Sequence, residues 1–238
     1  MGLDVVLASS YFAGCAGILA HVADVLTCYS ARPELDQLFH TPGDILDFRK
    51  ASVMMAEKTT WELAAGHVLA LIFIPSGFAG TCLLYKVLKP QYRWLRWPLV
   101  LLLFAFYVAG ALMHCSFTFV GLLASAPARG HVVPAGLSAD FQPFFEIICR
   151  LVGEIAMLPG CIFTFILLAA GATELPRWTA LLTPGPLQLL VAAVAPHTAL
   201  TFRMYMLVSI YNLSSGIWHL TLATAYALGG KRSSLKES

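Results

Sequence analysis

Residues 98–124 read PLVLLLFAFYVAGALMHCSFTFVGLLA, an apolar run that contains no Asp, Glu, Lys or Arg. A helix needs about 20 such residues to cross the hydrocarbon core of a bilayer. Runs of the same kind lie at residues 5–29, 61–85, 144–172 and 204–228, and a shorter run bounded by prolines lies at 184–199. The sequence therefore predicts an all-α, polytopic membrane protein with a bundle of about six transmembrane helices; five and seven are the alternatives.

The composition points to the same class. Of the 238 residues, 58% are hydrophobic and only 12% are charged, and the mean hydropathy is +0.75. A folded soluble domain cannot hide that much apolar surface from water. The net charge of +2 is too small for a surface that tracks phosphates, so nucleic acid is excluded as a partner. We expect one integral membrane domain over residues 1–238, with the lipid bilayer as its partner.

Basic residues predict the orientation. The loop after the second run carries Lys86, Lys89, Arg93 and Arg96, and the chain ends in a basic segment at 231–238. Loops rich in Lys and Arg stay in the cytoplasm, whereas the loop at 126–143 has only one basic residue. Both termini are therefore predicted to be cytoplasmic, with 231–238 as a cytoplasmic tail.

Residues 30–60 form a long polar segment on the predicted outer side. The sequence Thr41-Pro42-Gly43-Asp44 is typical of a helix start, and apolar residues then recur as in an amphipathic helix. The segment is either a plain interfacial helix or a lid over an outward-facing cavity.

Ionisable residues inside the predicted spans are the main functional signal, because each costs about 2.5–3.5 kcal/mol to insert unless it faces the bundle interior. His21 and Asp24 share one face of the first helix. Glu62 and His67 open the second helix about 140° apart. His114 lies in a stripe of small and polar residues on the third.

The later helices carry two further patterns. Glu146, Arg150 and Glu154 follow one another at intervals of four residues, which predicts a charge network on one helix face. Tyr205, Asn212, His219 and Tyr226 follow one another at seven-residue intervals in the last helix and predict an inward-facing stripe. A structural ion-pair ladder and ordinary interhelical hydrogen bonding are the alternatives.

These residues define the predicted site. The predicted catalytic residues are Glu62, His114, Glu146 and Glu154. The predicted substrate-binding residues are His21, Asp24, His67, Arg150, Asn212 and His219. The leading hypothesis is an enzyme (isomerase, cyclase or hydrolase) that acts on a lipid or isoprenoid-like substrate by acid–base chemistry in an outward-facing cavity. A transporter or proton-coupled carrier and a non-catalytic assembly protein are the alternatives.

Cofactor motifs are missing from the sequence. It contains no His-Glu-x-x-His, no phosphate-binding loop and no Gly-x-Gly-x-x-Gly. We therefore predict no cofactor and no metal ligand. The alternative is a divalent metal such as zinc, held by His21, His67 and His114 together with Asp24 or Glu154.

Several stretches resemble a family of small multi-pass membrane proteins that carry a domain of unknown function. They are the first helix from Gly14 to Asp24, the second from Gly66-His67 through Pro75-Ser76-Gly77 to Tyr85-Lys86, the run Ala111 to Phe117, and Asn212-Leu213-Ser214. The resemblance implies a polytopic helical fold and no particular activity.

A second likeness is more local. Trp61-Glu62 at a helix start is similar to the Trp-Glu pair of small integral-membrane terpene cyclases, which implies a carboxylate that acts as an acid in the membrane. The last helix of this chain departs from that pattern because it lacks an acid.

Overall fold

A computed structural model of the chain describes residues 3–134 and 136–234, with side chains for 5–134 and 136–229. These residues form helices and connecting turns; apart from one backbone bridge between Leu88 and Thr173, no β-structure occurs among them. Part of the predicted tail at 231–238 lies outside the described residues.

Four helical stretches of the described chain are long and apolar enough to cross a membrane: Val5–Cys28, Thr60–Val87, Pro90–Ser125 and Leu137–Ala169. They correspond to the first four predicted runs. The helices within them are α1 (Leu3–Cys28), α3 (Thr60–Ser76), α4 (Thr81–Val87), α5 (Arg96–Ser125), α6 (Leu137–Arg150) and α7 (Leu158–Ala169). α3 continues into α4 through the 3₁₀ turn η3 (Gly77–Gly80). α6 continues into α7 through the π-helix η6 (Leu151–Met157). The fourth stretch starts already at Leu137 rather than at 144.

The last two predicted spans form helices of a different character. α8 (Pro184–Val194) has 11 residues, so it is about 16 Å long against a hydrocarbon core of about 30 Å. α9 (Leu200–Ser234) has 35 residues, but polar and small residues are distributed along it. Four described helices are therefore long and apolar enough to cross a membrane, and the fifth and sixth spans stay a prediction.

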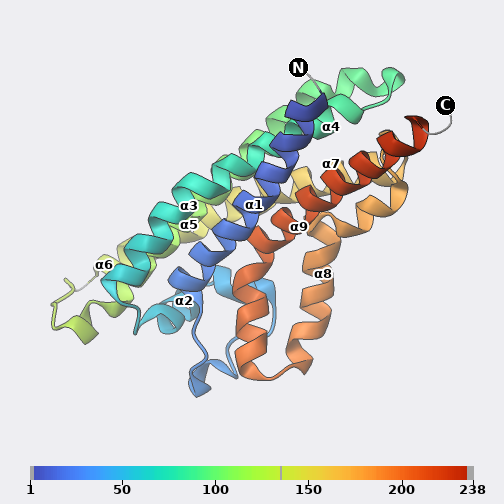
Figure 1. The fold of residues 1–238 in the computed structure, drawn as a ribbon. Helices are drawn as coiled ribbons and strands as arrows, with labels where there is room; N and C mark the ends of the chain where they lie inside the picture. Colours follow the sequence, from blue (N-terminus) through green and yellow to red (C-terminus); the bar gives the residue numbers. More distant parts are fainter. Residues whose placement is uncertain (1–2, 135, 235–238) are drawn as a thin grey trace.

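The helices run between two ends of an elongated bundle (Figure 1). α1 begins at the end where α9 finishes. We call this end the basic end, because it holds the turns η4 (Pro90–Leu95) and η7 (Arg177–Leu182) with their cations. The opposite end, which we call the capped end, holds η1 (Pro33–Leu35), η2 (Pro42–Leu46), α2 (Phe48–Met55), η5 (Pro127–Arg129) and η8 (Ala195–His197).

Residues 30–60 close the capped end instead of lying loosely on it. Phe39, Ile45, Met54 and Met55 are almost completely buried and belong to the same apolar cluster as residues of α1, α5 and α9. The expected amphipathic helix is α2. Its apolar face is thus part of the protein core.

Asp44 holds the start of this segment together, as the Thr41–Asp44 pattern predicts. Its carboxylate accepts hydrogen bonds from the backbone nitrogens of His40 (2.8 Å) and Thr41 (2.6 Å), and it pairs with Lys50. Partial burial alone raises the pKa of Asp44. The hydrogen bonds from Lys50, His40 and Thr41 outweigh it and hold the pKa below the usual range of an aspartate.

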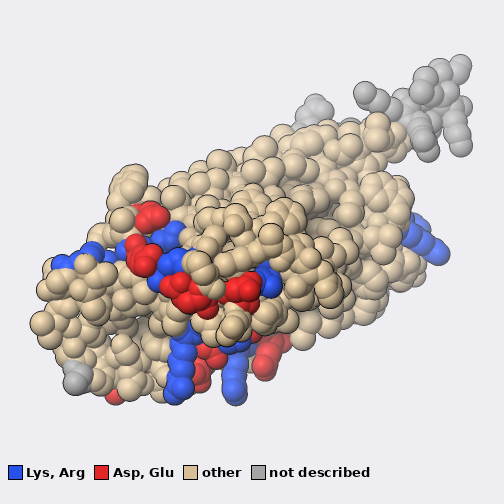
Figure 2. Space-filling view, turned by 90° about the horizontal axis from the view of Figure 1, so that it is seen from below, with Lys and Arg blue, Asp and Glu red and all other residues tan. Residues whose placement is uncertain are grey.

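Opposite charges meet mainly at the capped end (Figure 2). The ion pairs between basic and acidic side chains of the described chain are Arg32 with Glu34 and Glu57, Lys50 with Asp44, Lys58 with Glu62, and Arg203 with Asp36. Arg203 lies near the start of α9, so its pair with Asp36 ties the cap to the last helix.

α1 and α9 cross with their backbones in close contact. A Cβ atom placed on Gly17 would lie 2.6 Å from the Cα and N atoms of Gly216. A Cβ on Gly216 would lie 3.0 Å from the carbonyl oxygen of Gly14 and from the Ile18 nitrogen. Only glycine lets the two backbones touch here, and small residues are what membrane helices use for close packing.

We predict that Gly17→Ala destabilises the protein by about 1–3 kcal/mol, because backbone atoms cannot move aside for the new methyl group. Thermal unfolding of the purified protein in detergent measures this. The control is Gly229→Ala on α9, where a Cβ meets nothing within 4 Å. Equal melting temperatures for the two variants would contradict the crossing.

Candidate functional site

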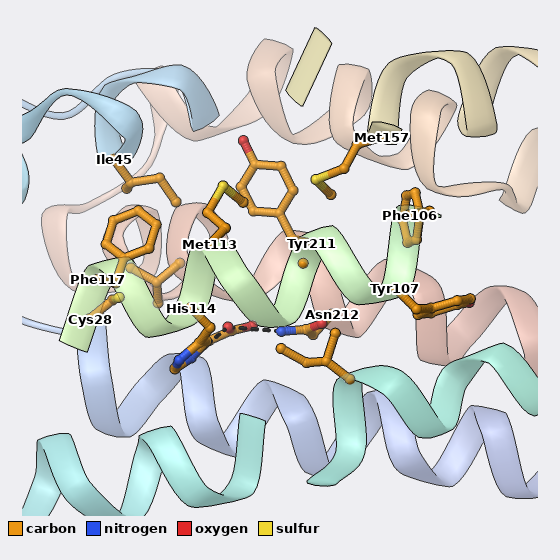
Figure 3. Close-up of a pocket in the computed structure, with 14 residues that line it drawn as sticks. Cys28, Ile45, Phe106, Tyr107, Met113, His114, Phe117, Met157, Tyr211 and Asn212 are labelled. Carbon is orange, nitrogen blue, oxygen red and sulfur yellow. Dashed lines mark hydrogen bonds and ion pairs between the residues drawn. The ribbon is translucent and has the colours of Figure 1, made fainter. Parts of the chain in front are cut away.

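A small internal cavity of about 50 Å³ lies between α1, α5 and α9, toward the capped end (Figure 3). Its polar lining groups come from Asp24, Tyr107, His114, Tyr211 and Asn212. The other lining residues are Cys28, Ile45, Ile74, Phe106, Gly110, Met113, Phe117, Met157 and Val208. A volume of this size has room for a few water molecules or for one small polar group of a ligand.

Asp24 is the centre of the cavity's polar side. Asn212 Nδ2 donates a hydrogen bond of 2.9 Å to Asp24 Oδ1, and His114 Nε2 lies 3.6 Å from the same oxygen. The side chains of Asp24 and His114 are 10% and 6% exposed. A carboxylate and an imidazole thus face each other in a site that is nearly closed to solvent.

Several polar atoms of this group have no hydrogen-bond partner. They are Asp24 Oδ2 and both ring nitrogens of His114, all of them buried. Buried polar atoms are normally paired, so unpaired ones mark a place for water or a ligand. An unpaired carboxylate oxygen beside an unpaired imidazole is able to exchange protons with a bound molecule.

Close helix packing places these residues together. The Gly17–Gly216 crossing brings α9 against α1, and Asn212 lies one turn before Gly216. On the other side of α1, a Cβ on Gly66 would lie 2.2 Å from Thr27 Oγ1, so α3 also touches α1 beside Asp24. His114 lies on α5, in the stripe of small and polar residues that the sequence indicates, and lines the cavity from that helix.

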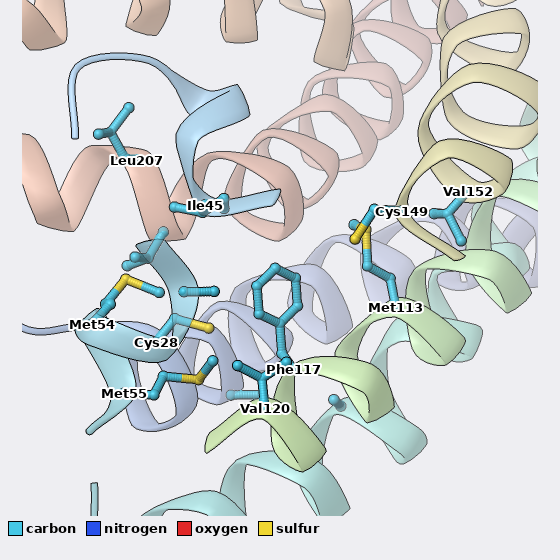
Figure 4. Packing of buried hydrophobic residues seen from close by; sticks show 14 of the residues in the cluster. Cys28, Ile45, Met54, Met55, Met113, Phe117, Val120, Cys149, Val152 and Leu207 are labelled. Carbon is cyan, nitrogen blue, oxygen red and sulfur yellow. The ribbon is translucent and has the colours of Figure 1, made fainter. Parts of the chain in front are cut away.

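Apolar residues close the cavity on the side of the capped end (Figure 4). Ile45 of η2, Met113 and Phe117 of α5 and Leu207 of α9 belong to one buried cluster that also contains Met54 and Met55 of α2. The cap therefore covers this end of the bundle beside the Asp24–His114 pair.

α9 makes two further polar contacts at the predicted seven-residue interval. Tyr205 hydrogen-bonds His21 Nε2 through its hydroxyl group at 2.8 Å. His219 is fully buried and hydrogen-bonds the hydroxyl group of Tyr107, which also lies 2.9 Å from Ser215 Oγ. Three members of the predicted stripe of α9, Tyr205, Asn212 and His219, thus make interhelical hydrogen bonds.

A larger groove of about 800 Å³ lies next to the cavity, between η6, α7, α8 and η2. Met113, Met157 and Tyr211 line both the groove and the cavity, so they form the wall between them. Tyr211 donates a hydrogen bond of 3.2 Å to the carbonyl oxygen of Pro42. Sequence reasoning missed this groove.

The predicted site residues separate into two groups. Asp24, His114 and Asn212 meet at the cavity, whereas His67 does not line it. His21 and His219 lie on either side in their own hydrogen bonds. The carboxylates predicted to be catalytic lie elsewhere. Glu62 caps α3 by accepting from Thr59 N and Oγ1 at 2.8 Å, and Glu146 accepts from Gln142.

The predicted charge network on the fourth helix does not form. Glu146, Arg150 and Glu154 make no ion pair with one another in the described structure, and Arg150 and Glu154 are exposed. None of the three side chains lines the Asp24 cavity. Glu154 instead lines the groove.

The sequence contains a pattern that could have identified two of the residues that line the groove. Gln188 is the one polar residue within the apolar run at 187–195, and Tyr211 directly precedes Asn212 in the inward stripe. A lone amide in an apolar helix costs free energy unless it faces a partner or a ligand.

No group of three or more His, Cys, Asp or Glu side chains in residues 3–134 and 136–234 is arranged to hold a metal ion. Glu154 lines the groove and not the Asp24 cavity. The alternative zinc site built from His21, His67, His114 and an acid therefore gains no support.

Residues 5–227 match a family model described as "Family of unknown function (DUF6796)". This confirms the predicted likeness to an uncharacterised family. No curated protein and no solved structure matches the chain. The likeness of Trp61-Glu62 to terpene cyclases stays a prediction.

We predict that Asp24 and Asn212 are energetically coupled. Asn212→Ala leaves the buried Asp24 Oδ1 without its donor and is expected to cost about 1–3 kcal/mol. In a variant that already carries Asp24→Leu the same change is expected to cost less, because no carboxylate remains to be satisfied. Thermal unfolding of the four proteins gives the coupling free energy. Additive effects would show that the hydrogen bond does not contribute.

Proposed function

The chain belongs to this family of unknown function, and we propose from its site that it is a multi-pass membrane enzyme that acts on a lipid or isoprenoid-like substrate by acid–base chemistry. Asp24 and His114 carry the reaction in this proposal. The predicted roles of Glu62 and Glu146 are given up, because both carboxylates already serve as local hydrogen-bond acceptors away from the cavity.

One observation carries the proposal. A buried carboxylate and a buried imidazole with unpaired atoms line a cavity that shares a wall with a large apolar groove. Nδ1 of His21, His67 and His219 is also buried without a partner, but of the four histidines only His114 lines the cavity. An apolar groove with a few convergent polar groups is the usual form of a small-molecule site.

The geometry gives Asp24 and His114 different roles in the proposed reaction. Asn212 holds Asp24 Oδ1, which leaves Oδ2 free to give a proton to the substrate or to take one from it. His114 performs the opposite transfer at another atom of the substrate. His114 Nε2 lies 3.6 Å from Asp24 Oδ1, and a water molecule that bridges His114 and the carboxyl group would return the proton after turnover.

The proposal includes a six-span topology with both termini in the cytoplasm and residues 30–60 outside. The alternating direction of the helices supports it (Figure 1). The sequence also places Lys86, Lys89, Arg93 and Arg96 in the loop at the basic end. α8 and α9 would then be the fifth and sixth spans. The Asp24 cavity would lie in the outer half of the membrane.

Single cysteines test this topology in a variant without the six native cysteines. Gln91→Cys at the basic end and His131→Cys after α5 are both exposed positions. We expect a membrane-impermeant maleimide to label His131→Cys from outside and Gln91→Cys only after permeabilisation. Labelling of both from one side would overturn the topology.

Comparative lipid mass spectrometry tests the enzyme. Membranes that contain the wild-type protein are expected to lose one lipid species and to gain its isomer or cleavage product. Asp24→Asn and His114→Gln are expected to slow this conversion about 10²–10⁴-fold, which is the usual contribution of a general acid or base.

Matched controls are Asp140→Asn and His131→Gln, because both residues are exposed and distant from the cavity. Gel filtration shows whether each variant is folded. If folded Asp24→Asn and His114→Gln variants leave the lipid profile identical to that of the wild type, the proposed chemistry is wrong.

A further inference from the structure

Backbone hydrogen bonds hold together the chain segments that lead into the turns η4 and η7 at the basic end. The one β-bridge of the described chain joins these segments. Beside the bridge, Lys89 N donates to the carbonyl oxygen of Ala172 at 3.0 Å. Glu174 N donates to the carbonyl oxygen of Val87 at 2.8 Å. The segment after α7 therefore lies against the segment after α4, and the charged residues of both belong to one surface (Figure 1).

This surface has an excess of positive charge. Residues 85–98 and 170–183 contain one acid, Glu174, and five cations. The cations, which we call the basic surface, are Lys86, Lys89, Arg93, Arg96 and Arg177. None of them forms an ion pair within the described chain, whereas the capped end contains five such pairs between basic and acidic side chains. Figure 2 agrees, because no Asp or Glu atoms are visible beside the Lys and Arg atoms at the basic end.

The basic surface lies where apolar helices end. Of the four stretches that are long and apolar enough to cross a membrane, Thr60–Val87 ends here and Pro90–Ser125 begins here. Trp94, Trp97 and Trp178 each directly follow an arginine in the sequence, and they are 72%, 68% and 52% exposed. Indole rings are enriched at the head-group level of a bilayer, because they combine an apolar body with a polar N–H group. The cations are therefore at the depth of the lipid head groups.

Contacts within the protein hold two arginine side chains of the basic surface in place. The guanidinium carbon of Arg96 lies 4.5 Å from the centre of the Tyr85 ring, which is a cation–π contact. Arg177 packs on Gly171, where a Cβ atom would lie 2.7 Å from Arg177 Nε. A guanidinium group presents paired N–H donors that match two oxygens of a phosphate. Because these two side chains are already ordered, binding a phosphate costs them little conformational entropy.

A phospholipid with a net negative charge matches these features. Its phosphate accepts hydrogen bonds from arginine, and its net charge is attracted by all five cations. In a zwitterionic phospholipid the ammonium group lies close to the phosphate and offsets this attraction. The acyl chains would lie beside α5, where Leu101 and Phe104 are 64% and 52% exposed. An acidic peptide would match the charge but not the apolar surface next to it.

We propose that the basic surface binds anionic phospholipids, whose phosphate groups are held by Arg93, Arg96 and Arg177 and attracted by Lys86 and Lys89. The proposal goes beyond the function proposed above, because it concerns the opposite end of the bundle and needs no chemistry at the internal cavity. It agrees with a basic end that faces the cytoplasm, since the cytoplasmic leaflet carries the anionic lipids.

The test is native mass spectrometry of the full chain in a neutral detergent, titrated with phosphatidylglycerol or with phosphatidylcholine of the same acyl chains. We expect phosphatidylglycerol to bind about fivefold more tightly or better, and more ammonium acetate to reduce this preference by screening. Equal affinity for the two lipids would overturn the proposal. Binding of a poly-glutamate peptide without any preference for phosphatidylglycerol would assign the surface to an acidic protein instead.

Matched charge substitutions test the position of the site. Arg93→Gln and Arg177→Gln are each expected to weaken phosphatidylglycerol binding about threefold to fivefold, the contribution of one cation near an anionic head group. The control is Arg49→Gln, because Arg49 is an exposed cation of the capped end that forms no ion pair within the described chain. It is expected to leave the affinity unchanged. Equal losses in Arg49→Gln and Arg177→Gln would show that binding follows total charge, and would overturn the assignment to the basic surface.

Asp24→Asn separates this proposal from the proposed enzyme. The variant is expected to keep the wild-type affinity for phosphatidylglycerol, because Asp24 lines the internal cavity. A wild-type protein that converts a lipid but does not prefer phosphatidylglycerol would overturn the lipid-binding surface alone. A wild-type protein that prefers phosphatidylglycerol but converts no lipid would support the surface and overturn the enzyme alone.

Discussion

The backbone contact between α1 and α9 is the constraint on which the site depends. Gly17 and Gly216 allow the two helices to touch, and this fixes which residues of α9 face α1. Asn212 meets Asp24 and Tyr205 meets His21 because both lie along the same side of α9 as Gly216. In a bilayer the hydrophobic effect does not drive helices together, so close packing and hydrogen bonds have to do so. The polar residues thus hold the bundle together and also form its site.

The position of the first four spans, the cap and the inward stripe of α9 could be predicted from the sequence. Each rests on a local signal: apolar length, a Thr-x-x-Asp capping pattern, or a seven-residue interval. The extent of α8 and the groove could not be predicted in this way. They depend on how three helices diverge, and that is set by contacts between residues distant in the sequence.

The contrast between local signals and contacts of distant residues also explains which parts of the site could be predicted. Asp24, His114 and Asn212 could be selected from the sequence because ionisable and amide groups are costly in hydrocarbon. Their partners could not be assigned, since spacing within one helix says nothing about the neighbouring helix. Glu146, Arg150 and Glu154 illustrate the limit. Their regular spacing predicts a network, but the three side chains make no ion pair with one another, and Arg150 and Glu154 lie exposed on the surface of the bundle.

The shortness of α8 has a consequence for the surrounding membrane. A helix of about 16 Å cannot match a hydrocarbon layer of about 30 Å, and lipids respond to such mismatch by thinning locally. Thinning would bring head groups and water closer to the bundle beside α8, where the groove opens. An amphiphile could then slide its chain between α7 and α8 while its head stays near the interface. The bilayer defect would itself lower the barrier to entry.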